Sequence, residues 1–106
     1  MEKIVEQGLL YDFYGELLTE HQKQIYEAAV YNDMSLTEIA DEHGISKQGV
    51  HDLIKRCTRS LQEYEDKLHM IKKSEAIRTQ AERLKDVSNG DAELISISDK
   101  ILEELG

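Results

Sequence analysis

The absence of proline constrains this chain more than any other feature of its sequence. None of the 106 residues is proline, and only six are glycine. Proline interrupts helices, and glycine weakens them by about 1 kcal/mol relative to alanine. Long runs of β-branched residues, which favour strands, are missing as well. The sequence therefore predicts an all-α fold.

Apolar residues at helical spacing, separated by cap and turn residues, divide the chain into helices. Two helix starts carry a capping box: Thr19 with Gln22, and Ser35 with Glu38. The sequence Ser88-Asn89-Gly90-Asp91 is the clearest turn. The expected helices run over residues 3–17, from 19 to a turn at 32–33, from 35 to 44, from 46 through 71, and over 91–105, with a bend or a new helix near 73.

The first two helices carry the residues expected to pack between them. Ring side chains gather there and could form either this core or a platform for base stacking; their helical spacing favours the core. These rings are Tyr11, Phe13, Tyr14, Tyr26 and Tyr31. In the first helix, the positions expected to be buried are Ile4, Leu9 or Leu10, Phe13, Tyr14 and Leu17.

Residues 35–56, SLTEIADEHGISKQGVHDLIKR, have the spacing of two helices that meet at a steep angle. Ala40 is small where the helices would cross, and Gly44 tolerates the positive φ of a tight turn. Apolar side chains for a shared core are supplied by Ile39, Ile45, Val50 and Leu53. This pattern predicts a helix-turn-helix.

The second helix of this motif presents polar and basic residues on its outer face. Gln48 has the donor and acceptor that read adenine, whereas Lys47 and Lys55 suit guanine or phosphate. The alternative is an ordinary solvated face, which Asp52 favours because a carboxylate in a groove is costly unless cytosine donates to it. The candidate nucleic-acid-binding residues are Ser46, Lys47, Gln48, His51, Lys55, Arg56 and Arg59.

The net charge of −9 is unevenly distributed along the chain. Residues 1–45 hold ten acids and two bases (−8), residues 46–85 hold ten bases and six acids (+4), and residues 86–106 hold six acids and one base (−5). Because salt screens charges beyond about 8–10 Å, a local basic surface can still bind a polyanion. Strong non-specific binding to DNA is not expected.

The stretch from Tyr14 to about Arg59 resembles the fourth region of housekeeping sigma factors. The residues of this chain that carry the resemblance read LLTEHQKQIYEAAVYNDMSLTEIADEHGISKQGVHDLIKRCTRSL. With MEKIVEQGLLYDFYGELLTEHQ near its start, the whole chain, most securely residues 5–68, resembles the YlxM-type family of small bacterial helix-turn-helix proteins. In that family the gene typically lies beside those for the signal-recognition-particle GTPase and its receptor. The resemblance implies a regulatory or accessory role in protein targeting. Sigma recognition helices tend to carry arginine and glutamate, where this chain has Gln48, Gly49 and Asp52.

Enzymatic and metal chemistry are not expected. The four histidines lack the close spacing of a zinc site, no glycine-rich phosphate loop is present, and Cys57 takes an inward position in its helix. We therefore expect no cofactor and no enzyme activity. A single cysteine suits the reducing cytoplasm. The N-terminus is acidic and has no long apolar run, which predicts no membrane span.

The expected organisation is a helix-turn-helix head over residues 1–68 and a helical extension over 69–106, packing on the head or on a second subunit. The stripe Leu61, Tyr64, Leu68 and Ile71 favours a homodimer. Two hypotheses of function remain. One is a regulatory protein that binds DNA or signal-recognition RNA; the other is an accessory module that binds a signal-recognition-particle protein and no DNA.

Overall fold

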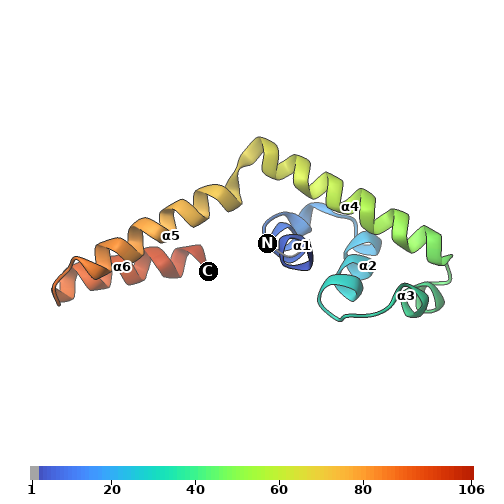
Figure 1. Ribbon diagram of the computed structural model, residues 1–106, viewed down its shortest axis with the longest axis horizontal. Helices are drawn as coiled ribbons and strands as arrows, with labels where there is room; N and C mark the ends of the chain where they lie inside the picture. The colour runs from blue at the N-terminus through green and yellow to red at the C-terminus, as the bar shows by residue number, and fades with distance from the viewer. Residues whose placement is uncertain (1–2) are drawn as a thin grey trace. The chain divides into compact units, whose positions relative to one another are not determined.

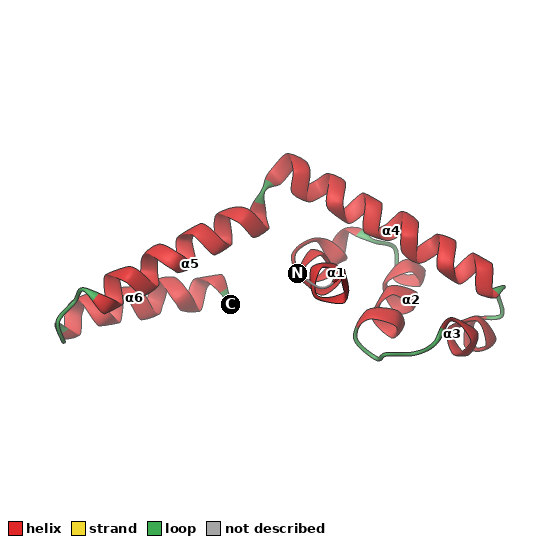
Figure 2. Cartoon of the chain, viewed as in Figure 1, coloured by secondary structure: helices red, strands yellow, loops and turns green. Residues whose placement is uncertain are grey.

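The computed structural model describes residues 3–106, and these residues form helices joined by short connections (Figures 1 and 2). No strand occurs among them. The all-α prediction is confirmed. In chain order, the elements are α1 (Lys3–Tyr14), the 3-10 turn η1 (Gly15–Leu17), α2 (Glu20–Val30), α3 (Leu36–His43), α4 (Lys47–Leu68), α5 (Met70–Asp86) and α6 (Ala92–Leu105).

The chain divides into two compact units, which meet in sequence between His69 and Met70. We call the first unit, up to His69, the head and the second, Met70–Gly106, the hairpin. None of the described helices is long and apolar enough to cross a membrane.

Both predicted capping boxes are present in the head. The Gln22 N–H donates to the Thr19 hydroxyl at 3.2 Å, and the Thr19 N–H donates to the Gln22 side chain at 2.9 Å. Ser35 and Glu38 exchange the same two bonds at 3.1 Å each. Each box satisfies two N–H groups that a helix start leaves without partners, which explains why α2 and α3 begin where the sequence predicts.

The head is organised around α4, which packs against α1, α2 and α3. The side chains of Ile25, Tyr26, Ile39, Val50 and Leu61 are completely buried. They come from α2, α3 and α4, so one apolar core joins these helices. The exposed face of α4 is therefore held by a packed body rather than by an isolated helix.

The prediction of the buried face of α1 was partly wrong. Leu10 and Tyr14 are buried, but Ile4, Phe13 and Leu17 are exposed by 46%, 38% and 58%. For Leu17 the reason is that α1 ends at Tyr14 and the chain tightens into η1. A 3-10 turn has 3.0 residues per turn instead of 3.6, so Leu17 turns outward, and Leu18 is buried in its place.

Most of the aromatic cluster forms core contacts. The rings of Tyr11 and Tyr26 stack with centroids 5.6 Å apart, and the Tyr14 ring lies 6.0 Å from that of Tyr64 on α4. Tyr31 meets Tyr11 edge-on at 5.6 Å but keeps half of its surface exposed. The core interpretation holds for Tyr11, Tyr14 and Tyr26, whereas Phe13 lies at the surface.

The break after α4 occurs at His69 and not near residue 73, where it was predicted. His69 adopts the left-handed conformation, with φ of 55°, and its N–H donates to the Glu65 carbonyl at 2.8 Å. Histidine is one of the few residues besides glycine that enter this region with some frequency. The phase shift in the apolar pattern at residues 72–74 falls inside α5, because a new helix has already begun at Met70.

The hairpin consists of α5 and α6, which pack against each other. The predicted turn is confirmed: Asn89 and Gly90 have φ of 52° and 81°, and the Asp91 carboxylate accepts the N–H groups of Glu93 and Leu94. Small side chains occupy the most buried positions. Ala81 is 2% exposed and Ser98 is completely buried, with its hydroxyl donating to the Leu94 carbonyl.

Candidate nucleic-acid interface

The turn between α3 and α4 has the geometry of a helix-turn-helix. Gly44 has φ of 66°, and its N–H donates to the Ala40 carbonyl. The Ile45 N–H donates to the same carbonyl at 3.2 Å. Ala40 is buried where α3 meets α4, as a close crossing of two helices requires. Three residues thus separate two helices that share a core.

Gly49 has a structural role at the start of α4. The Ser46 hydroxyl accepts the Gly49 N–H at 2.9 Å and so caps the helix. A Cβ built on Gly49 would lie 3.0 Å from that hydroxyl oxygen. The glycine leaves room for the cap, a reason for its presence that helix propensity does not reveal.

All seven candidate binding residues are exposed. Ser46 stands at the cap of α4, and the other six lie on its first four turns. In the described part of the chain, no carboxylate forms an ion pair with Lys47, Lys55, Arg56 or Arg59. Their charges are therefore available to an anionic partner.

Asp52 binds its neighbours on the exposed face. Its Oδ1 accepts an N–H of Gln48 at 3.0 Å and lies 3.7 Å from Nδ1 of His51. The second N–H of Gln48 and its carbonyl oxygen take no part in this bond. The sequence shows the four-residue spacing of Gln48 and Asp52 but does not show that they are bonded.

Thr58 lies at a junction of three helices beneath this face. Its hydroxyl donates to the Ile54 carbonyl at 2.9 Å, so the Tyr26 hydroxyl, at 2.9 Å, is the donor in their contact. The Gln7 amide of α1 donates to the same oxygen at 3.3 Å. These bonds fix α1 and α2 against the middle of α4.

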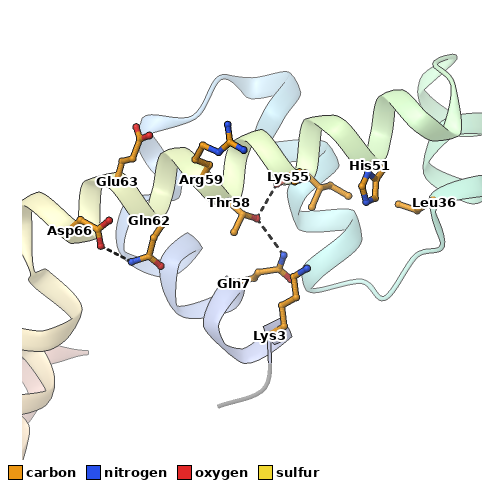
Figure 3. Close-up of a pocket in the computed structure, with 11 residues that line it drawn as sticks. Lys3, Gln7, Leu36, His51, Lys55, Thr58, Arg59, Gln62, Glu63 and Asp66 are labelled. Carbon is orange, nitrogen blue, oxygen red and sulfur yellow. Dashed lines mark hydrogen bonds between the residues drawn. The ribbon is translucent and has the colours of Figure 1, made fainter.

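Two hollows border the basic face of α4. The larger has a volume of about 640 Å³ and lies between α1, the start of α3 and α4 (Figure 3). The smaller, about 460 Å³, is lined by Gly49, Asp52, Lys55, Arg56 and Arg59. Lys55 and Arg59 line both hollows and form the ridge between them. The residues lining the larger hollow are Lys3, Gln7, Leu36, His51, Ile54, Lys55, Thr58, Arg59, Gln62, Glu63 and Asp66.

The described residues contain no group of three or more histidine, cysteine, aspartate or glutamate side chains that could hold a metal ion. Cys57 is 2% exposed, and burial raises the pKa of its thiol. Because the thiolate is the reactive form, Cys57 is suited to packing rather than to nucleophilic chemistry.

Comparison with known proteins identifies the family. Residues 1–101 match the profile described as "Putative helix-turn-helix protein, YlxM / p13 like". The chain belongs to this helix-turn-helix family.

Its relatives match over most of their length. The UPF0122 protein of Acetivibrio thermocellus is 43% identical over 99% of this chain and 92% of the relative. The UPF0122 protein YlxM of Bacillus subtilis is 39% identical over 88% and 84%, respectively. The resemblance to the YlxM-type family seen in the sequence is confirmed. The family description names a helix-turn-helix protein and not an enzyme.

Proposed function

We propose that this protein is a regulatory helix-turn-helix protein that binds nucleic acid through the exposed face of α4. One observation carries this proposal: Lys47, Lys55, Arg56 and Arg59 stand exposed on the helix that follows a well-formed helix-turn-helix turn, and no carboxylate of residues 3–106 forms an ion pair with them. This concentration of free cations in a chain of net charge −9 favours local binding of a polyanion.

The positions of the side chains favour a division of roles. Ser46, Lys47, Gln48 and His51 lie at the tip and first turns of α4, the part that enters a groove in helix-turn-helix complexes. Gln48 is suited to a base edge. Lys55, Arg56 and Arg59 lie further along the helix and are suited to hold backbone phosphates.

We further propose that the protein acts in the cytoplasm, in the signal-recognition-particle pathway, with DNA or signal-recognition RNA as its nucleic acid. This step rests on the family resemblance, because genes of that family typically lie beside genes of the signal-recognition-particle pathway. The competing function is binding to a protein of the particle through the acidic helices of the head. Exposed carboxylates such as Glu6, Asp41 and Glu42 favour this alternative.

A homodimer formed through the hairpin completes the proposal. Ile77, Val87 and Ile97 are 47%, 68% and 44% exposed. With so much apolar surface exposed, the two helices bury less apolar area than a small unit needs to be stable on its own. A second copy of the chain offers a matching apolar surface, as symmetric oligomers do.

The test of nucleic-acid binding is a salt series with a random-sequence DNA duplex and with signal-recognition RNA. We expect binding with a slope of log affinity against log salt of about −3, since few phosphates are engaged. Changing Lys55 and Arg59 to glutamate should weaken binding to all sequences, whereas Gln48→Ala should mainly reduce discrimination between sequences. Lys72 and Lys73, changed together to glutamate on α5, give a control with the same change of charge.

Absence of binding to either nucleic acid at about 50 mM salt would overturn the nucleic-acid function. Capture of a particle protein that persists after Lys47 and Lys55 are changed to glutamate would then favour the protein-binding alternative.

A further inference from the structure

The larger hollow of the head begins at the proposed binding residues and extends away from them. His51 and Lys55 line it together with Leu36 at the start of α3 and with Lys3 and Gln7 of α1. Figure 3 shows the Lys3 side chain extending from α1 toward α4 beside Gln7, on the side where Lys55 and Thr58 lie. A basic residue from the first helix thus reaches the surface next to the recognition helix.

Lys3 differs from the other basic residue of the acidic N-terminal block. Residues 1–45 contain two bases, Lys3 and Lys23. The Lys23 ammonium is held by Glu16 at 3.0 Å and lies 3.7 Å from Glu20, so its charge is compensated within the head. Lys3 instead adds its charge to the hollow that Lys55 and Arg59 line from α4.

The geometry points to a second contact with nucleic acid: we propose that the hollow between α1 and α4 holds one phosphodiester strand, with Lys3 and Lys55 binding its phosphates. The inference rests on the proposed function of α4 and adds α1 to the binding surface. The Gln7 amide donates one N–H to Thr58 and keeps a second for a phosphate oxygen.

The length and charge of the hollow fit a short piece of strand. From His51 to Arg59, α4 rises about 12 Å, which matches three to four nucleotides at about 3.4 Å each. Glu63 and Asp66 line the far end of the hollow. Their carboxylates repel phosphates, so the strand lies beside the segment of α4 from His51 to Arg59, between Lys55 and Lys3, and leaves before Glu63.

The wall that carries Lys3 is fixed to α4. The bond between Gln7 and Thr58, at 3.3 Å, spans α1 and α4, and Thr58 is itself bonded to Ile54 and Tyr26. A cation placed by such a network reaches the strand without reordering the helix beneath it, which favours binding.

The experiment compares Lys3→Ala and Lys3→Glu with Lys100→Ala and Lys100→Glu in the full chain. Lys100 is exposed on α6, so each pair changes the net charge equally. Binding to a random-sequence DNA duplex is measured by fluorescence anisotropy over a salt series from about 50 to 200 mM. Melting temperatures check the fold, which should not change because both lysines are exposed.

Loss of one phosphate contact should reduce the magnitude of the salt slope by about 0.9 in Lys3→Ala, with no change in Lys100→Ala. Lys3→Glu should weaken binding about tenfold at 50 mM salt and clearly more than Lys100→Glu. Equal behaviour of the two pairs, with binding by the unmodified chain intact, overturns the role of Lys3 and leaves the proposed function standing. No binding by the unmodified chain overturns both.

Discussion

The head and the hairpin are both helical, but they bury very different side chains. Five large side chains, Ile25, Tyr26, Ile39, Val50 and Leu61, are completely hidden from solvent in the head. In the hairpin, the residues below 9% exposure are Ala81, Ser88 and Ser98, none of which has a large apolar side chain. Since apolar burial is the main stabilising contribution to folding, the head has a core of large apolar side chains, whereas the hairpin completely buries none.

Under the proposed function, this difference suits the two regions to separate tasks. A packed head holds the exposed face of α4 in one orientation, as sequence reading in a groove requires. A hairpin with uncovered apolar side chains is suited to assembly. Helix-turn-helix proteins that read two half-sites need a fixed spacing between their recognition helices, which a dimer supplies.

The largest expected effect is on the core of the head. Leu61→Ala removes a completely buried side chain of α4 and should lower the free energy of unfolding by about 2–5 kcal/mol. Leu68→Ala, on the same helix but 48% exposed, is the matched control and should cost less than about 1 kcal/mol. Urea denaturation measures both. Similar losses for the two variants would mean that the head has no distinct core.

The next effect concerns assembly through the hairpin. Ile77 and Ile4 are nearly equally exposed, at 47% and 46%, but lie in the hairpin and the head. If the hairpin forms the dimer, Ile77→Glu should convert dimer to monomer because it places a charge in an apolar interface. Ile4→Glu should leave the protein a dimer, with the mass of the assembly unchanged. Analytical ultracentrifugation distinguishes these outcomes, and a monomeric unmodified chain would contradict the dimer.

The sequence predicted those parts of the fold that depend on neighbouring residues. The capping boxes at Thr19 and Ser35, the turn at Gly44 and the cap at Asp91 are each determined within a few positions, and all are present. The exposure of the Leu17 side chain and the break at His69 were not predicted. The spacing of apolar residues does not reveal a 3-10 turn or a histidine in the left-handed conformation.

The candidate site divides in the same way. The seven residues from Ser46 to Arg59 could be named because they lie on one helix with a regular spacing. The contribution of Lys3 could not, because it depends on α1 packing against α4 about fifty residues further along the chain. Likewise, the composition could not show that Glu16 and Glu20 engage Lys23 while Lys3 lines the hollow.

The smallest effect compares one substitution in the turns of the two regions. Gly44 in the head and Gly90 in the hairpin have φ of 66° and 81°, and a Cβ on either would meet no atom within 4 Å. Changing either to alanine therefore tests backbone strain alone, which amounts to about 1 kcal/mol once the lower entropy of the unfolded chain is included.

Gly44→Ala should speed hydrogen exchange at the amides of α3 and α4, which share the head's core. Gly90→Ala should speed exchange in α5 and α6 and leave the head's protection unchanged. If Gly90→Ala loosened the head equally, the two regions would unfold as one, and the contrast between a self-sufficient head and a dependent hairpin would be wrong.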